Sequence, residues 1–177
     1  MRVIAGIYGG RRLQAPRGRE VRPTADRVKE ALFSMLGPLD GLAVLDLFAG
    51  SGALGIEALS RGAASAVFVD GSEAATTVIA ANLRALGAQG EIVRRPVRAY
   101  LDAARSQQAL YDLVFLDPPY RLATDLGPEL SSTLPPVLAR GARVVAECDR
   151  RLPLQLPLAL DTERCYGDTL IRIHHAP

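Results

Sequence analysis

The strongest constraint on the fold is a glycine-rich loop that joins an expected strand to an expected helix. Residues 43–47 (AVLDL) are apolar enough for a buried strand, and residues 53–61 have a helical pattern. Between them, residues 50–55 (GSGALG) match the G-x-G-x-x-G pattern of nucleotide-binding loops. Gly50 and Gly52 allow a sharp turn and let a ligand approach the amides where the helix begins. The loop therefore predicts an α/β fold with a nucleotide-like cofactor at the end of this strand.

Alternating strand and helix patterns continue through most of the chain. They fall at residues 43–47, 53–61, 66–70, 73–86, 91–94, 97–105, 111–116, 125–139 and 142–147. Such alternation predicts a doubly wound, parallel, Rossmann-like sheet. Two further strand-like runs, 162–166 and 169–174, predict an antiparallel C-terminal hairpin. A chain of 177 residues with 49% hydrophobic content can bury one sizeable core.

Acidic residues lie at the ends of the first two expected strands. Asp70 stands 20 residues beyond Gly50, where a carboxylate can accept hydrogen bonds from both hydroxyls of an adenosine ribose. Asp46 would repel a neighbouring pyrophosphate but attract a cation such as the ammonium of a methionine moiety. A nicotinamide dinucleotide fits the loop itself equally well, but no His-Asp or Tyr-Lys hydride-transfer pair follows. S-adenosylmethionine is therefore the predicted cofactor, and its predicted contacts in this region are Asp46, Phe48, Gly50, Ser51, Gly52, Asp70 and Gly71.

A second motif, Asp-Pro-Pro-Tyr at residues 117–120, follows the apolar run 111–116. Two prolines cannot continue a strand ladder, so the chain must leave the sheet rigidly there. The Asp117 carboxylate and the Pro118 carbonyl can accept hydrogen bonds from an exocyclic amine while Tyr120 stacks on the ring. A tight turn at a sheet edge would look the same in isolation, and the glycine loop upstream favours a site. The predicted catalytic residues are Asp117, Pro118, Pro119 and Tyr120.

These motifs occur together with two others, RPTADRVKEALF at residues 22–33 and YGDT at residues 166–169. The set resembles the bacterial methyltransferases that make N2-methylguanosine in small-subunit ribosomal RNA (the RsmD type), over almost the whole chain. The resemblance implies S-adenosylmethionine-dependent methylation of a guanine in 16S ribosomal RNA, within an assembled or assembling small subunit. Many relatives carry an acidic or amide residue after the third strand, where this chain has residues 94–97 (RRPV). Adenine is therefore expected to contact backbone groups and the apolar Pro96 and Val97.

Other functions remain compatible with parts of the pattern. An adenine-N6 methyltransferase of DNA or RNA would use the same Asp-Pro-Pro-Tyr chemistry, which does not distinguish adenine from guanine. A cytosine-C5 enzyme needs a thiolate nucleophile, and Cys148 lies between acidic residues that would raise its pKa. A catalytically silent RNA-binding or assembly module would have no use for an intact Asp-Pro-Pro-Tyr motif.

The N-terminal region is basic. Residues 1–29 carry eight basic side chains and two acidic ones, although the whole chain has a net charge of only +2. We expect a hairpin of residues 3–8 and 12–14 through Gly9 and Gly10, then a helix over 26–36. Residues 1–37 would pack on a catalytic domain of residues 38–177 as one folding unit, and the basic part would bind a polyanion. The predicted substrate contacts are Arg11, Arg12, Arg22, Thr24 and Arg27.

The sequence gives no sign of export or membrane insertion. The apolar part of the N-terminus is too short for a secretory signal, and no run approaches membrane-spanning length. Cys148 and Cys165 form no metal-binding pattern, so no metal is expected. These features predict a cytoplasmic monomer whose partner is ribosomal RNA.

Overall fold

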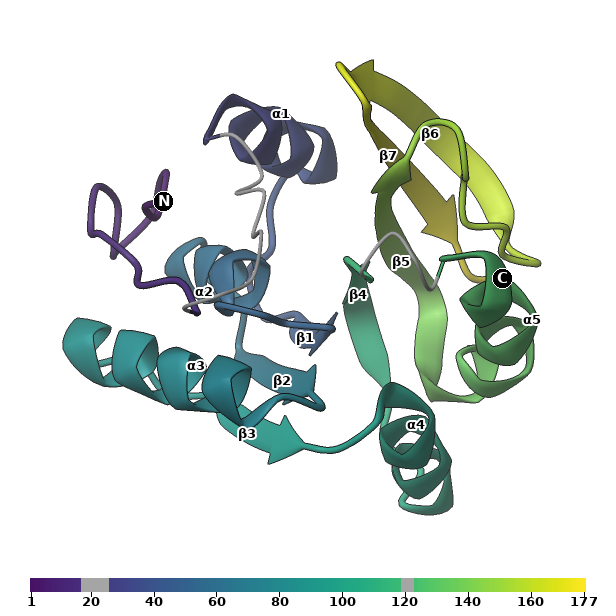
Figure 1. The fold of residues 1–177 in the computed structure, drawn as a ribbon, viewed down its shortest axis with the longest axis horizontal. Helices are drawn as coiled ribbons and strands as arrows, with labels where there is room; N and C mark the ends of the chain where they lie inside the picture. The colour runs from purple at the N-terminus through teal and green to yellow at the C-terminus, as the bar shows by residue number, and fades with distance from the viewer. Residues whose placement is uncertain (17–25, 119–122) are drawn as a thin grey trace.

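The computed structural model describes residues 1–16, 26–118 and 123–177, which form a seven-stranded sheet of order β3-β2-β1-β4-β5-β7-β6 (Figure 1). Strands β1 to β5 are parallel, and β7 runs antiparallel to both of its neighbours. The strands are β1 (Ala43–Leu47), β2 (Ser65–Asp70), β3 (Glu91–Arg94), β4 (Tyr111–Leu116), β5 (Leu138–Asp149), β6 (Ala159–Tyr166) and β7 (Thr169–His175). The predicted doubly wound sheet with an antiparallel C-terminal hairpin is confirmed.

Helices cover both faces of the sheet. They are α1 (Asp26–Leu36), α2 (Ala53–Ser60), α3 (Glu73–Leu86), α4 (Val97–Ser106), α5 (Ala123–Thr133) and the 3-10 helix η2 (Pro135–Val137). Phe115 of β4 packs into a core with α1, α2 and α3, whereas Val114 packs into a second core with α4 and α5. Because adjacent strand residues point to opposite faces, β4 is buried on both sides. Within the described ranges, no helix has the length and apolar character needed to cross a membrane.

The predicted boundaries between the last helix and the fifth strand were wrong. The helix expected over residues 125–139 ends at Thr133, and β5 begins at Leu138 rather than at residue 142. Pro135 and Pro136 explain the difference, because each lacks a backbone N–H and restricts the residue before it. The chain makes a short 3-10 turn there and enters the sheet early.

The predicted N-terminal hairpin was also wrong in part. Its two arms form one antiparallel bridge, between Arg2 and Arg12, and a further backbone hydrogen bond from Gly10 N to the Val3 carbonyl. Residues 5–10 form bends and turns instead of a strand. The backbone donors that would have formed a ladder are satisfied by α2: Ile7 N donates to the Ser60 carbonyl at 2.8 Å and Tyr8 N to Ser60 Oγ at 2.9 Å. Gly6 lies directly on this helix, with φ of +82°, where a side chain would collide with the Ser60 carbonyl. Residues 1–16, called here the N-terminal arm, are therefore laid against the body.

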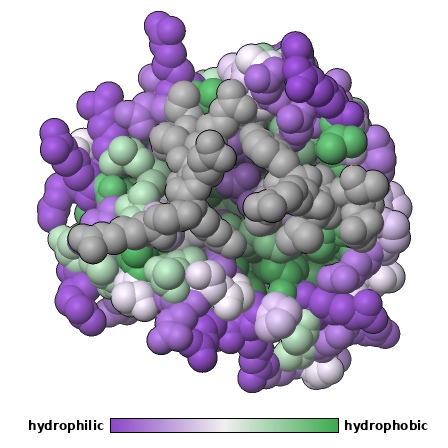
Figure 2. Space-filling model, in the orientation of Figure 1, coloured by the Kyte–Doolittle hydropathy of each residue, from purple (hydrophilic) through white to green (hydrophobic). Residues whose placement is uncertain are grey.

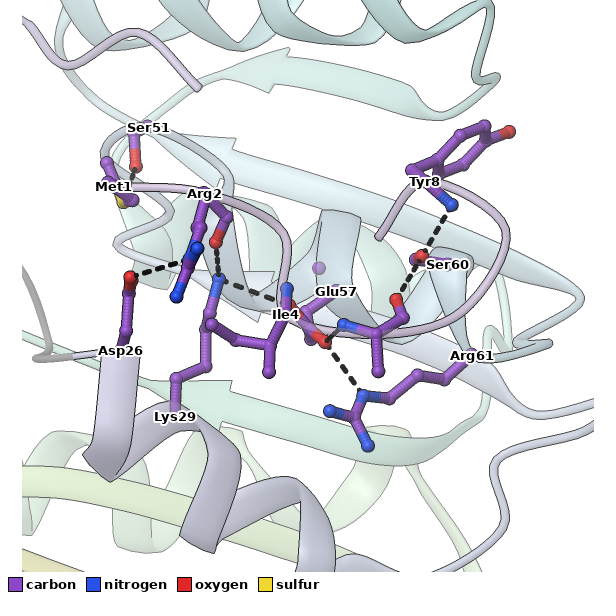
Figure 3. Close-up of polar contacts among 12 residues, drawn as sticks. Met1, Arg2, Ile4, Tyr8, Asp26, Lys29, Ser51, Glu57, Ser60 and Arg61 are labelled. Carbon is purple, nitrogen blue, oxygen red and sulfur yellow. Dashed lines mark hydrogen bonds and ion pairs between the residues drawn. The ribbon is translucent and has the colours of Figure 1, made fainter. Parts of the chain in front are cut away.

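Glu57 on α2 holds this arm and α1 in place. Its side chain is fully buried and accepts hydrogen bonds from Ile4 N at 2.7 Å and Ala5 N at 3.0 Å. Figure 3 shows Lys29 and Arg61 also reaching Glu57, at 3.1 Å and 2.8 Å. One carboxylate thus ties the arm, α1 and α2 together.

Lys29 is buried and stabilises the fold, so it adds no charge to the surface of the basic region. It is only 1% exposed, and it donates a hydrogen bond to the Arg2 carbonyl at 2.5 Å as well as pairing with Glu57. Burial lowers its pKa, and the Glu57 carboxylate opposes that change. The polyanion-binding charge expected from residues 1–29 must therefore come from the arginines.

We predict that Glu57→Ala destabilises the protein by about 3–5 kcal/mol, because it leaves the buried Lys29 ammonium and two amides without their acceptor. The free energy of unfolding in urea measures this loss. The matched control is Glu73→Ala, which breaks an ion pair with Arg94 whose side chains are 79% and 56% exposed. That control should cost about 0–1 kcal/mol, and equal losses in the two variants would contradict the role given to Glu57.

Candidate active site

Four carboxylates follow one another across the sheet where its parallel strands end. Asp70, Asp46, Asp117 and Glu147 belong to the ends of β2, β1, β4 and β5, and the register pairs Leu47 with both Val69 and Leu116, and Leu116 with Ala146. Two positions before each acid, the chain has a residue that packs into the core beneath α1, α2 and α3. Because alternate residues of a strand point to the same face, all four acids face that side of the sheet. Those core residues are Phe68, Val44, Phe115 and Val145.

Two of these carboxylates shape the glycine loop. Asp70 accepts hydrogen bonds from Gly50 N at 3.0 Å and from Ser72 N at 2.8 Å. Asp46 accepts one from Gly55 N at 2.9 Å, at the first turn of α2. Both predicted cofactor ligands are thus engaged with the backbone. Contact with a ribose or an ammonium group stays a prediction.

The backbone between β1 and α2 is strained at one non-glycine position. Phe48 has φ of +60°, a left-handed conformation that bulky residues seldom adopt. Gly50 and Gly52 follow with φ of +57° and +76°. Strain of this kind persists where the surrounding structure enforces it, and it concentrates at ligand sites.

Open space lies over two of the predicted cofactor contacts. A Cβ added to Gly50 would meet only the Phe48 carbonyl, at 3.8 Å, and one added to Gly71 would meet only the Arg95 carbonyl, at 4.0 Å. By contrast, a Cβ on Gly55 would lie 2.4 Å from the Phe68 ring, so this glycine serves packing. The space over the first two glycines fits a cofactor lying across the ends of β1 and β2.

The remaining predicted cofactor contacts differ in exposure. Ser51 is buried within the loop, and Val97 is buried in the second core at the start of α4. Pro96 precedes α4 as its N-cap residue. The apolar surface expected for adenine thus lies at the end of β3, next to Gly71, although most of the Val97 side chain belongs to the core.

Of these four carboxylates, called here the acidic row, two have raised pKa values. Burial raises the pKa of Asp46 to about 7, with Asp70 adding to the rise and the Gly55 N–H opposing it. Asp117 is open to solvent on one side, yet the protein around it raises its pKa, and Glu147 and Asp46 raise it further. Glu147 itself is only 6% exposed. Sequence reasoning missed Glu147 as a site residue, and its only signal is an acidic residue within the apolar run of residues 144–148.

The other predicted site residues are partly described. Pro118 is buried beside Asp117, while Pro119 and Tyr120 lie outside the described residues. Cys148 is buried, its thiol lies 3.8 Å from the Leu170 carbonyl, and burial raises its pKa. A cysteine nucleophile for cytosine methylation is therefore disfavoured.

Of the predicted substrate contacts, Arg11 and Arg12 lie on the arm and Arg27 lies on α1. Arg11, Arg12 and Arg27 are exposed, and Arg11 also donates to the Ala85 carbonyl of α3 at 2.8 Å. Arg22 and Thr24 lie outside the described residues. Figure 2 shows that hydrophilic residues make up most of the rim of the molecule in this view.

We predict that Asp46→Asn loses part of the pH dependence of stability. The pKa of Asp46 rises from 3.8 to about 7 on folding, so between these values the folded carboxyl keeps a proton that the unfolded one has released. Stability therefore falls as the pH rises from about 4 to about 7, by up to about 4 kcal/mol from this group. Urea unfolding across this range tests it with the exposed Asp102→Asn as control; an unchanged slope in Asp46→Asn would contradict it.

Comparison with known proteins places the fold in a family. The family model described as "Conserved hypothetical protein 95" matches residues 1–175. A Bacillus subtilis protein named "Putative rRNA methyltransferase YlbH" is 38% identical over 185 residues, covering 98% of each chain. The Escherichia coli "Ribosomal RNA small subunit methyltransferase D" is 40% identical over 123 residues, which are 68% of this chain and 61% of the relative.

Solved structures agree with this placement. The Escherichia coli protein named "Putative methyltransferase yhhF" superposes with a TM-score of 0.82 at 33% identity, covering 99% of this chain and 97% of the other. The Thermus thermophilus 16S rRNA N2 methyltransferase RsmC, solved with AdoMet and guanosine, superposes with a TM-score of 0.75 at 22% identity. It covers 92% of this chain and 45% of RsmC, and at this identity it supports the fold alone. Sequence and structure together show that the chain belongs to the RsmD-type family of ribosomal RNA methyltransferases.

Proposed function

We propose that this protein transfers a methyl group from S-adenosylmethionine to the exocyclic N2 amine of a guanine in small-subunit (16S) ribosomal RNA. The observation that carries the proposal is the position of Asp117, which follows β4 directly beside the glycine loop that follows β1. An amine held by Asp117 would lie next to a methyl donor held over Gly50 and Gly71. Family membership supports the same reaction.

The protein's main task in this reaction is to position and activate the amine. S-adenosylmethionine supplies a methyl group that its sulfonium already activates. Asp117 and the Pro118 carbonyl accept hydrogen bonds from the amine, which turns the nitrogen lone pair out of conjugation with the ring and towards the methyl group. Alignment of two reactants can contribute roughly 7–11 kcal/mol. Asp117 also stabilises the positive charge that develops on nitrogen, an interaction stronger in the transition state than before it.

The raised pKa of Asp117 agrees with this task. Desolvation by the surrounding protein and the carboxylates of Glu147 and Asp46 make the ionised form of Asp117 costly in the protein alone. A bound cation and a developing positive charge on the amine would both favour that ionised form. The acidic row is therefore suited to a cationic donor and to an amine substrate.

Glu147 favours guanine over adenine as the target base. The Watson–Crick edge of guanine presents the N1–H donor beside the N2 amine, whereas adenine presents an N1 lone pair beside its N6 amine. Neighbouring carboxylates at Asp117 and Glu147 match two adjacent donors and would repel the adenine lone pair. Adenine-N6 methylation, the alternative, lacks this match.

The ribosomal RNA would be bound from the arm side of the sheet. Arg11, Arg12 and Arg27 are exposed there and can contact phosphates, as predicted for the substrate-binding region. The target guanine must be unstacked to reach Asp117, which is easiest in a loop or bulge of an assembling small subunit. We expect a monomer to act in the cytoplasm.

We predict that Asp117→Ala lowers kcat by at least about 10²–10³-fold, because the amine loses its acceptor and its charge stabilisation. Transfer of labelled methyl groups to small ribosomal subunits that lack the modification measures kcat, and titration with S-adenosylhomocysteine measures cofactor binding. Cofactor affinity should change little. Loss of cofactor binding with an unchanged kcat would show that Asp117 binds the cofactor and not the amine, which would contradict this role.

We predict that Glu147→Gln moves the acidic limb of the kcat/KM profile to lower pH. Removing the neighbouring negative charge lowers the pKa of Asp117, so Asp117 stays ionised further into the acid range. The variant should also raise KM for the RNA. The matched control is Glu163→Gln on the exposed strand β6, which should leave the profile unchanged. An acidic limb that stays in place in Glu147→Gln would contradict this coupling.

A further inference from the structure

Asn82 lies where the N-terminal arm meets the glycine loop. It is on α3, only 2% exposed, and its side-chain amide faces two segments that are distant in sequence. Its Nδ2 donates to the Ser51 carbonyl at 2.9 Å and to the Gln14 carbonyl at 3.1 Å. Its Oδ1 accepts from Gln14 N at 2.8 Å. Both donors and the acceptor of this amide are therefore used, and only one orientation of the amide satisfies all three bonds.

On the loop side, Asn82 fixes the residue between the two left-handed glycines. Ser51 follows Gly50, whose amide is bound by Asp70, so the loop is held by a carboxylate on one side and by Asn82 on the other. The Ser51 hydroxyl adds a weaker contact to the Met1 sulfur of the arm at 3.5 Å, visible in Figure 3. Release of the Ser51 carbonyl would free the loop on its arm side.

On the arm side, Asn82 binds backbone atoms only three residues from the exposed Arg11. Arg11 itself donates to the carbonyl of Ala85, one turn further along the same helix. Leu13, between them, is buried in the core, so this stretch of arm moves as a unit with α3. A polyanion bound to these arginines would therefore hold the backbone that Asn82 contacts.

We propose that Asn82 is a positioning residue that couples RNA binding by the arm to cofactor binding by the glycine loop. RNA held by Arg11, which also donates to the Ala85 carbonyl of α3, would stabilise the contacts between Gln14 and Asn82, and Asn82 in turn holds the Ser51 carbonyl. By thermodynamic linkage, RNA then tightens cofactor binding by the same factor by which cofactor tightens RNA binding. The coupling rests on the proposed function, because that function supplies the RNA partner. The hydrogen bond from Asn82 to the Ser51 carbonyl does not depend on the proposed function.

The test compares S-adenosylhomocysteine affinity with and without a saturating 16S ribosomal RNA transcript. We predict that the transcript tightens binding to the wild-type protein at least about fivefold, within the usual range of coupled sites. Gln14→Ala, which keeps the backbone bonds to Asn82, should retain this ratio. Gln14→Pro removes the backbone N–H that donates to Asn82 Oδ1. The ratio of cofactor affinities with and without RNA should therefore fall towards one, while the cofactor affinity without RNA stays the same.

Asn82→Asp tests the loop side with a side chain of nearly the same shape. It removes both donors and turns a carboxylate towards two carbonyls, so we expect roughly tenfold weaker cofactor binding without RNA and loss of the RNA effect. Gln14→Pro keeps the test decisive if Asn82→Asp does not fold. The coupling would be overturned if RNA left the cofactor affinity of the wild-type protein unchanged. It would also be overturned if RNA tightened cofactor binding to Gln14→Pro as much as to the wild-type protein.

Failure of the proposed substrate gives a different result. In that case the wild-type protein binds S-adenosylhomocysteine but neither the transcript nor small ribosomal subunits that lack the modification, which refutes ribosomal RNA as the partner and the coupling with it. Cofactor affinity of Asn82→Asp against Gln14→Ala still decides whether Asn82 holds the loop, and equal affinities would refute that role too.

Discussion

Parallel pairing of β1 with β4 is the constraint on which the site depends. The two strands are distant in sequence, and the strand order reverses between them, so the crevice at their carboxyl ends is the usual ligand position of an open α/β sheet. This pairing brings the glycine loop after β1 next to Asp117, the first residue after β4. It also places Asp46 close enough to raise the pKa of Asp117, a repulsion that a cationic methyl donor would relieve.

A second, polar layer attaches the basic arm to this sheet. Glu57 is buried where α2 meets the arm, and its ion pair with Lys29 brings α1 into the same assembly. Asn82 makes the corresponding connection between the arm and the glycine loop. The arm is therefore held against α2 and α3, and RNA bound at the arm, as proposed, would be linked through Asn82 to the glycine loop.

Local sequence patterns predicted the parts of the fold that local chemistry determines. The strand–loop–helix pattern around Gly50 and Gly52 was confirmed, because only glycine tolerates those backbone angles at little cost. The end of α5 was misplaced because an apolar run hid the effect of Pro135 and Pro136. Glu147 was missed because its meaning depends on register: only the pairing of β4 with β5 places it beside Asp117. Lys29 was counted as surface charge because its buried partner lies on another helix.

The central claim is that the protein methylates N2 of guanine in 16S ribosomal RNA. The most direct measurement is transfer of labelled methyl groups from S-adenosylmethionine to small ribosomal subunits that lack the modification, followed by digestion to nucleosides and identification of the labelled product. The account predicts N2-methylguanosine as that product. Labelled N6-methyladenosine, or a methylated cytidine, would contradict the assignment of the base and the role given to Glu147 beside Asp117.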